Sequence, residues 1–265
     1  MSTRKKKIIK NKTIKNKTFL NKCKINSIYW INLDRSTERR KSMKEVLKNQ
    51  VFDDMKKHRV SAFDGLDPKF VNYLQKNVEN VNFNRNTPKE YACLLSHIKA
   101  IQEFVKSGDD IAIIFEDDLS MEFKKYWKTT LEECICNAPK DWEILQLYYN
   151  NTKHNNNPKL LNKLYTEHKE NSKYFSAVAY VINKKGTTRF LKKLIKNNKF
   201  ILEKDTNNSY LRHVSDIYLY LKMKTYVYKY PFFTYVSKDT TIQPLKDVEY
   251  QKKIKKNMNK LLKNS

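Results

Sequence analysis

Glycine is scarce in this 265-residue chain, which contains only Gly65, Gly108 and Gly186. With glycines so far apart, neither GxGxxG nor GxxxxGK[ST] can be written, so dinucleotide-binding and P-loop motifs are excluded. The chain also has no GxSxG nucleophile elbow, and its five histidines form no HExxH motif. These absences remove the most common sequence signatures of cofactor-dependent redox enzymes, P-loop NTPases and α/β-hydrolases.

Cysteines are few and long apolar runs are absent. Cys23, Cys93, Cys134 and Cys136 are too few and too irregularly spaced for a disulfide framework, and the CxC pair has no second Cys/His pair at zinc-site spacing. We therefore expect four reduced thiols, which suits a cytoplasmic protein. No stretch approaches the roughly 18 apolar residues of a membrane span. A secretory signal requires an apolar segment behind its basic N-terminus, and no such segment follows the basic N-terminus of this sequence.

Acidic residues are in the minority, with 28 against 54 Lys and Arg and a formal net charge of +26. Residues 1–24 hold ten basic residues and no acid, and residues 246–265 carry a net +5, which leaves +11 for residues 25–245. We interpret 1–24 as a disordered basic tail, 246–265 as a basic C-terminal tail and 25–245 as one domain. A Lys- and Asn-rich composition explains the excess; the alternative is contact of a tail with an anionic surface.

Strand-like and helix-like segments alternate along the domain. Short aromatic and β-branched runs predict strands at 27–34, 58–65, 111–115, 142–149, 175–183 and 225–232. Apolar residues at helical spacing predict helices at 35–50, 90–108, from the acidic cluster to about 137, 184–196 and 215–224. This order favours an α/β domain with a mainly parallel, mixed sheet and helices on both faces. The polar segment 150–159 is a candidate lid or acceptor loop.

The segment IAIIFEDD, residues 111–118, places three carboxylates directly behind a buried strand. One interpretation is a turn or helix cap, because short carboxylates bond nearby N–H groups. The other is a divalent cation, since adjacent carboxylates repel each other and a hard cation compensates their charge. Residues i and i+2 of a strand face the same side, so Glu116 and Asp118 are the expected ligand pair. A cation held there would neutralise a departing diphosphate.

Three arginines, Arg35, Arg39 and Arg40, follow the first strand at the start of its helix. Arginine makes bidentate contacts to phosphate oxygens, and a helix N-terminus adds N–H donors. The alternative is a set of exposed helix charges, offset in part by Glu38 and Glu45. Arginines therefore follow the first strand and carboxylates follow the third, and together they would bind a phosphate ester and its metal ion. Ligands of α/β sheets collect at such carboxyl ends of strands.

Five segments together resemble glycosyltransferase family 25, the lipopolysaccharide-biosynthesis and procollagen-galactosyltransferase group. The matching segments are YWINLDRSTERR, TPKEYACLLSH, IIFEDD, AYVINKKG and SDIYLYL, and they follow the family order from about residue 27 to 245. Lys89 and Ala92 depart from the pattern, because the family usually has glycine at both positions. Lys89 would disturb a loop near the site if a positive φ were required there.

The resemblance implies a GT-A type nucleotide-diphospho-sugar transferase fold and transfer of galactose or glucose from a UDP-hexose with inversion. The nucleotide-sugar-binding positions would be Ile31, Asn32, Leu33, Arg35, Arg39, Ser96, His97 and Asp117. Glu116 and Asp118 would bind Mn²⁺ or Mg²⁺. For Ser96 the alternative is a bond back to a helix carbonyl, and for His97 a satisfied half-buried histidine.

Inversion requires one general base that deprotonates the acceptor hydroxyl, and such a base contributes roughly 10²–10⁴-fold. Asp216, at the start of a late helix, is the candidate for base or metal contact; the alternative is an N-cap, which Ser215 can also provide. The acceptor would be a glycolipid or lipopolysaccharide sugar, or a hydroxylysine of a collagen-like chain. Two other functions stay open: an inactive binding protein on the same fold, and a basic nucleic-acid-binding protein, although no nucleic-acid module is recognisable.

Overall fold

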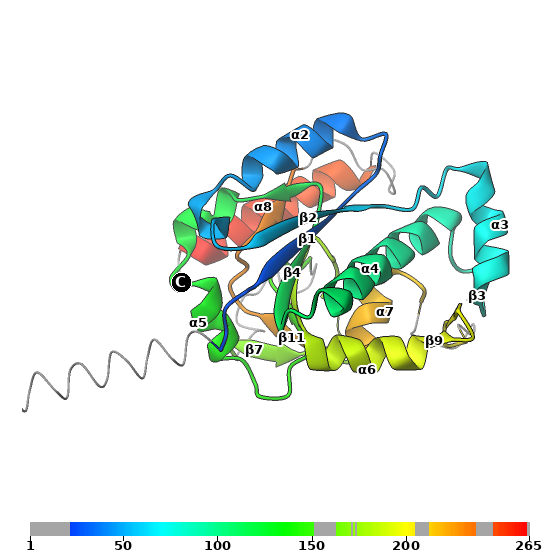
Figure 1. The fold of residues 1–265 in the computed structure, drawn as a ribbon. Coiled ribbons are helices and arrows are strands. Elements are labelled where there is room, and N and C mark those ends of the chain that lie inside the picture. Colours follow the sequence, from blue (N-terminus) through cyan, green and yellow to red (C-terminus); the bar gives the residue numbers. More distant parts are fainter. Residues whose placement is uncertain are drawn as a thin grey trace, which may run out of the picture.

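The structure is a computed structural model that describes residues 22–150, 163–170, 172, 174–204, 212–236 and 246–263. Nearly all of the predicted N-terminal tail, and the predicted acceptor loop beyond residue 150, lie outside these ranges. In the described part of the chain, a seven-stranded sheet forms the centre (Figure 1). Its spatial order is β2 (Lys56–Ser61), β1 (Ser27–Asn32), β4 (Ile111–Glu116), β8 (Ala179–Asn183), β6 (Ile144–Gln146), β11 (Thr225–Tyr228) and β7 (Tyr165–Glu167).

Five of these strands run in one direction, and β8 and β7 run against them. The prediction of a mainly parallel, mixed sheet is therefore confirmed. Both faces of the sheet are buried, as the near-continuous apolar sequence of the central strands requires. In β1, Ile28 and Trp30 belong to one apolar cluster while Tyr29 and Ile31 belong to the cluster on the other face. This alternation follows from the two-residue repeat of a strand.

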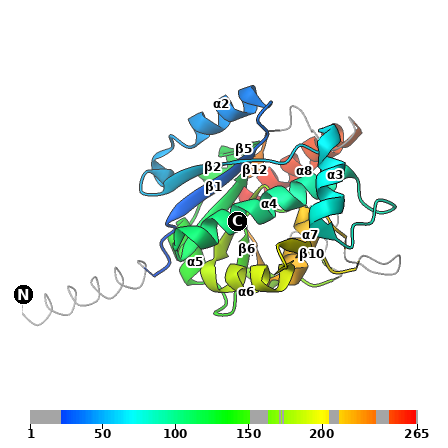
Figure 2. The ribbon, with the colours of Figure 1, turned by 45° about the vertical axis from the view of Figure 1, so that its right-hand side comes forward.

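Helices cover each face (Figures 1 and 2). One apolar cluster joins the sheet to α3 (Pro68–Asn77), α4 (Pro88–Ser107), α6 (Lys184–Leu194) and α7 (Ser215–Lys222). The other joins it to α2 (Thr37–Val46), α5 (Leu131–Cys136) and α8 (Lys246–Lys263). None of the described helices is both long and apolar enough to cross a bilayer.

Helix α4 has the clearest end signals. Thr87 and Glu90 form a capping box at its start, and Gly108 ends it with φ of +82°. The helix matters for the site because His97, near its middle, contacts Glu116 at the carboxyl end of β4.

Short elements complete the structure. Strands β3 (Val78–Glu79), β10 (Lys199–Ile201) and β9 (Ile195–Lys196) form a small sheet, and the 3-10 helices are η1 (Gln50–Phe52) and η2 (Glu122–Tyr126). Strand β5 (Leu119–Ser120), directly after the acidic cluster, pairs with β12 (Thr234–Tyr235). The N–H of Val236 donates to the carbonyl of Asp118 at 2.7 Å. The end of the domain thus fixes the backbone that carries the last carboxylate of the cluster.

Several predicted elements differ in extent. The predicted strand 142–149 is shorter in the structure, where β6 has only three residues. The predicted helix after the acidic cluster is replaced by β5, η2 and the short helix α5. Residues 246–263, assigned to a basic tail, form α8, in which Met258 and Leu262 are buried in the core. The lysine-rich composition concealed this helix, since long basic side chains keep their charge in water while the apolar residues face inward.

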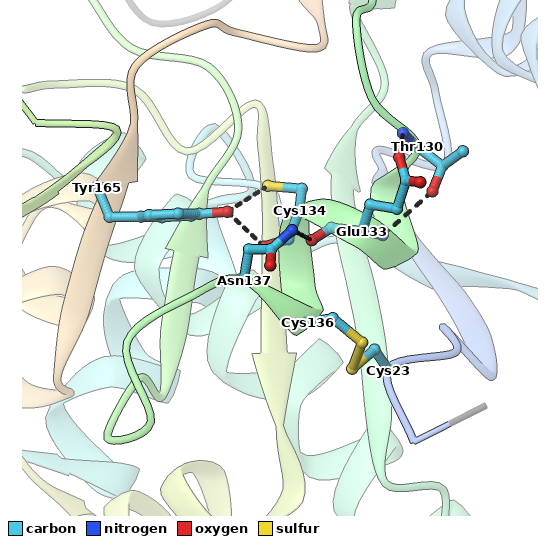
Figure 3. Close-up of a disulfide and its surroundings, with 7 residues drawn as sticks. All are labelled: Cys23, Thr130, Glu133, Cys134, Cys136, Asn137 and Tyr165. Carbon is cyan, nitrogen blue, oxygen red and sulfur yellow. Dashed lines mark hydrogen bonds between the residues drawn. A yellow bond between two sulfur atoms is a disulfide. The ribbon is translucent and has the colours of Figure 1, made fainter. Parts of the chain in front are cut away.

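Cys23 and Cys136 form a disulfide that joins the segment before β1 to the end of α5 (Figure 3). The prediction of reduced thiols is wrong for these two residues, and the argument from reduced thiols to a cytoplasmic location loses its basis. The pairing spans 113 positions, so cysteine spacing gave no signal for it. Cys134 has a free, buried thiol, and its backbone carbonyl accepts a 2.6 Å hydrogen bond from Tyr165 Oη. Cys93 is the other free cysteine among the described residues.

Candidate active site

Two adjoining clefts open at the carboxyl ends of β1, β2 and β4. The first has a volume of about 640 Å³, counting the solvent at its open mouth, and its lining includes all eight residues predicted to bind the nucleotide sugar, together with Glu116. The second is lined by Asp118 and Asp216. Arg39, Cys93 and Glu116 line both clefts and form the wall between them. The sheet therefore brings every predicted site residue to one edge, where ligands of α/β sheets bind.

Asn32 ends β1 and is buried. Its Nδ2 donates to Asp117 Oδ2 at 2.6 Å, and its Oδ1 accepts from Arg40 Nε at 2.9 Å and from Arg59 Nε at 3.1 Å. Both polar atoms of the Asn32 amide are thus hydrogen-bonded to other side chains of the protein. The contribution of Asn32 to the site is to orient Asp117.

Each of the three predicted arginines has its own set of partners. Arg39 reaches both aspartates of the acidic cluster, with Nη1 at 2.7 Å from Asp117 Oδ1 and Nη2 at 3.5 Å from Asp118 Oδ2. Arg35 binds Asp64 on the loop after β2, at 2.5 and 3.3 Å. Arg40 faces inward, toward Asn32 and the carbonyl of Asp34. Arg39 is therefore the arginine placed against the carboxylates, and it lines both clefts.

Burial controls the electrostatics of the two aspartates. Burial raises the pKa of Asp117, although Arg39 and Asn32 act in the opposite direction. For Asp118, burial and then the charge of Glu116 raise the pKa to about 7. Asp118 Oδ1 is buried and has no hydrogen-bond partner among the described residues. The ionised form of Asp118 therefore has too few hydrogen bonds and too little nearby positive charge to stabilise it fully.

His97 supports Glu116 from α4. Its Nε2 lies 3.1 Å from Glu116 Oε1 and its Nδ1 lies 2.9 Å from Tyr180 Oη. His97 and Tyr180 are both fully buried. An ionised Glu116 accepts from Nε2–H, so Nδ1 then accepts from the Tyr180 hydroxyl. His97 is thus a satisfied buried histidine, as the alternative interpretation held, and it also orients a carboxylate of the cleft wall.

Ser96 serves the local structure. Its Oγ donates to the carbonyl of Ala92 at 2.6 Å and accepts from the N–H of Phe63 at 2.9 Å. The back-bond to the helix is the alternative predicted for this residue. The same hydroxyl ties the loop after β2 to α4, so Ser96 shapes the first cleft through Phe63.

Lys89, the first of the two expected departures from the family pattern, lies within α4 and outside the positive-φ region. The expected disturbance of a loop is therefore absent. The position that requires glycine is Gly65, because an added Cβ there would lie 2.5 Å from the Cα of Lys89. The loop after β2 consequently packs directly on the start of α4.

Asp216 is the second residue of α7, whose N-cap position is Val214 without a side-chain cap. The alternative interpretation of Asp216 or Ser215 as the N-cap of this helix is therefore wrong, and the prediction of a base or metal contact at Asp216 stays a prediction. Asp216 Oδ2 instead accepts a 2.6 Å hydrogen bond from the N–H of Ser176, and burial raises the pKa of the carboxyl.

Ser176 adopts φ of +95°, a conformation that costs a non-glycine residue of order 1–3 kcal/mol. Its carbonyl accepts from Gln146 Nε2 and Tyr220 Oη, both at 2.9 Å, which holds the peptide in place. The strain keeps the N–H directed at Asp216 in the second cleft. Because the residue is serine and not glycine, the sequence carried no signal for this conformation.

Other supporting residues were not foreseen either. Arg59 and Ser61, on β2, both bind the carboxylate of Asp34, whose pKa is lowered chiefly by the Ser61 hydroxyl and then by Arg59. Tyr180 lies within the family-like segment AYVINKKG, but nothing in that pattern indicated its bond to His97. These contacts cross between strands and helices, which sequence periodicity cannot report.

A mixed α/β sheet with a carboxylate cluster at its strand ends fits a GT-A type glycosyltransferase. The chain matches, over residues 25–220, the family model described as "Glycosyltransferase family 25 (LPS biosynthesis protein)". This span is most of the chain, so the protein belongs to glycosyltransferase family 25 and is a glycosyltransferase.

A search of curated proteins returned no match. Among solved structures, a similar chain is described as "Crystal structure of a glycosyltransferase involved in the glycosylation of the major capsid of PBCV-1". It shares 9% identity with this protein, at a TM-score of 0.38, and the alignment covers 86% of this chain and 99% of that one.

Proposed function

We propose that this glycosyltransferase moves a hexose, galactose or glucose, from a UDP-sugar to an acceptor hydroxyl with inversion and with the help of a divalent cation. The observation that carries the proposal is the meeting of two clefts at Glu116 and Arg39. The first cleft would take the nucleotide, and the second carries the half-buried carboxylates of Asp118 and Asp216 on its wall. Donor and acceptor would meet at the wall that the clefts share.

The first cleft suits the nucleotide. Ile31, Leu33 and Phe63 give it apolar surface. Arg35 and Arg39 also line it, each paired with aspartate in the ion-free protein, and would turn toward the phosphates. Uridine would lie at the end of β1, and the diphosphate toward Arg39. Because Asn32 is occupied by Asp117, Arg40 and Arg59, its part would be to hold Asp117 near the ribose or donor sugar.

The acidic cluster fits Mn²⁺ or Mg²⁺. Hard cations take carboxylate oxygens, and Asp118 offers one that is buried and without a hydrogen-bond partner among the described residues. Glu116 and Asp118 line the second cleft together and would hold the ion. When bound, such an ion supplies positive charge that stabilises a departing diphosphate.

Asp216 would act as general base in the second cleft. Its carboxylate accepts a hydrogen bond from Ser176, and burial raises its pKa, so it binds a proton more readily than an exposed aspartate. The acceptor hydroxyl would lose its proton to Asp216 as the sugar transfers. The acceptor is a glycolipid or lipopolysaccharide sugar, or a hydroxylysine of a collagen-like chain; an excess of lysine suits an anionic glycolipid.

Calorimetry with UDP, with and without Mn²⁺, tests the site, and a screen of UDP-sugar hydrolysis tests the reaction. We expect UDP binding that requires the ion and hydrolysis of UDP-galactose or UDP-glucose. Ion-dependent UDP binding without turnover of any donor or acceptor would instead support an inactive binding protein. No UDP binding, together with strongly salt-dependent DNA binding, would support a nucleic-acid-binding function.

A further inference from the structure

Three side chains of different chemistry converge at the wall between the clefts. Cys93 Sγ, His97 Nε2 and Glu116 Oε1 all lie within 4.8 Å of one another. Cys93 and His97 are four residues apart on α4 and so share a face of the helix, while Glu116 ends β4. Thiolate and imidazole ligands favour Zn²⁺ and similar ions, whereas Mg²⁺ and Mn²⁺ favour oxygen ligands.

We propose that Cys93, His97 and Glu116 form a binding site for a thiophilic divalent cation of the Zn²⁺ class. This site differs in ligand chemistry from the pair Glu116 and Asp118, and it shares one carboxylate with that pair. Binding of the ion by the three side chains does not depend on the proposed donor or acceptor.

The geometry is close to what such an ion requires. Tetrahedral zinc sites have Zn–S near 2.3 Å and Zn–N near 2.0 Å, which places neighbouring ligand atoms about 3.3–3.6 Å apart. The His97 Nε2 to Glu116 Oε1 distance is already 3.1 Å. The thiol, now 3.4 Å from Ser215 Oγ, has to approach by about 1–1.5 Å at most. Three protein ligands leave a fourth position, which faces the clefts because Cys93 and Glu116 line both.

The surroundings also suit metal ligation by His97. A metal-bound histidine usually donates its other ring N–H to a neighbour, which fixes the tautomer. Tyr180 Oη, 2.9 Å from Nδ1, is placed to accept that proton once Nε2 binds the ion. The imidazole stays neutral and the thiol releases one proton to solvent. Thiolate and carboxylate then cancel the two charges of the cation, so no net charge is left at this half-buried position.

Titration of the full-length protein with Co²⁺, in the absence of thiol reductants, tests the site. We expect a thiolate-to-cobalt charge-transfer absorption in the wild type. Cys93→Ser should abolish it, whereas Cys134→Ser should retain it, because Cys134 is the other free described cysteine and lies in the core. The proposal is overturned if the wild type shows no such band or if Cys93→Ser keeps it.

A second measurement needs no variant. Zn²⁺ should slow alkylation of Cys93 at least about tenfold, as read by peptide mass spectrometry of the intact protein after labelling; equal rates with and without Zn²⁺ would overturn the proposal. Excess Mn²⁺ should also weaken the Co²⁺ band, because both ions need Glu116. This last result depends on the proposed function: a band that Mn²⁺ leaves unchanged argues against Mn²⁺ at Glu116 and leaves the thiophilic site standing.

Discussion

The side-chain amide of Asn32 donates a 2.6 Å hydrogen bond to Asp117, 85 residues away in the sequence, in a buried position. The same amide accepts hydrogen bonds from Arg40 and Arg59. One neutral side chain therefore sits between an aspartate and two guanidinium groups. The end of β1 is linked through it to the end of β4.

Asn32→Ala should lower the free energy of unfolding by about 2–3 kcal/mol. The substitution removes one hydrogen bond from Asp117 and one from each of the two guanidinium groups, which keep their contacts with Arg39 and Asp34, and a lost hydrogen bond to a charged group is costly. Urea unfolding of the variant measures the change. Asn84→Ala, at an exposed position, is the matched control and should stay within about 0.5 kcal/mol of the wild type. An equally small effect at Asn32 would contradict the linking role.

Asp118→Asn should abolish transfer while leaving the fold intact. The pKa of Asp118 is raised to about 7, so without a cation about half of the carboxyl groups are already protonated at pH 7, and the neutral amide should not destabilise the ion-free protein. Loss of a cation ligand should lower the rate at least about a hundredfold.

Thermal unfolding with and without Mn²⁺ separates these two effects of Asp118→Asn. The ion should raise the midpoint of the wild type, because a ligand at a hundred times its Kd adds about 2.7 kcal/mol, and it should not raise that of the variant. Transfer that persists after removal of the metal would contradict the assignment.

Asp216→Asn should lower kcat by about 10²–10⁴-fold and leave ion-dependent UDP binding unchanged. The amide oxygen still accepts the Ser176 hydrogen bond, but it cannot take a proton from an acceptor hydroxyl. Steady-state kinetics and calorimetry measure the two quantities. Asp110→Asn, an exposed position before the opposite end of β4, is the control for the substitution itself. Weaker metal binding with unchanged kcat would instead make Asp216 a metal contact.

Local sequence patterns predicted the parts of the site that depend on one segment. An apolar run followed by EDD predicted a buried strand with carboxylates at its end, and β4 has that form. The predicted helix 90–108 is α4, which ends at Gly108 as expected and begins two residues earlier than predicted, at Pro88 after the Thr87 cap. These features are readable because a strand or helix end is decided by neighbouring residues.

Contacts between distant segments were not predictable in this way. The hydrogen bonds of Asn32 to Asp117 and of Tyr180 to His97 depend on the order of the strands in the sheet. The hydrophobic periodicity of a sequence does not predict that order. The inclusion of Asp216 came from the family resemblance and not from spacing. Its partner Ser176 was missed because its positive φ is held by tertiary contacts.

Replacing both Cys23 and Cys136 by serine should lower the free energy of unfolding by about 2–4 kcal/mol. A disulfide that closes a loop of more than a hundred residues restricts the unfolded chain strongly. Peptide mass spectrometry without reductant should first show the linked pair. Reductant should then destabilise the wild type and leave the double variant unaffected. Rapid alkylation of both cysteines in the native protein would show that the bond is absent.

His168 should make the fold sensitive to mild acid. Its ring packs against Tyr174 and Tyr220, Nε2 donates to the carbonyl of Tyr174 at 3.2 Å, and Nδ1 is buried without a hydrogen-bond partner among the described residues. Burial lowers the pKa from 6.5 to about 4. Between these two values the unfolded chain binds a proton that the folded protein does not bind.

The free energy of unfolding should therefore fall as pH decreases from about 6.5 to 4, by at most about 1.4 kcal/mol per pH unit and about 3 kcal/mol in all, and this contribution should be absent above pH 7. His168→Gln keeps an N–H donor for Tyr174 but does not titrate. Its stability, measured by urea unfolding from pH 5 to 8, should fall less steeply than that of the wild type. Parallel curves would mean that His168 already has an ordinary pKa in the folded protein, and that water reaches its buried nitrogen.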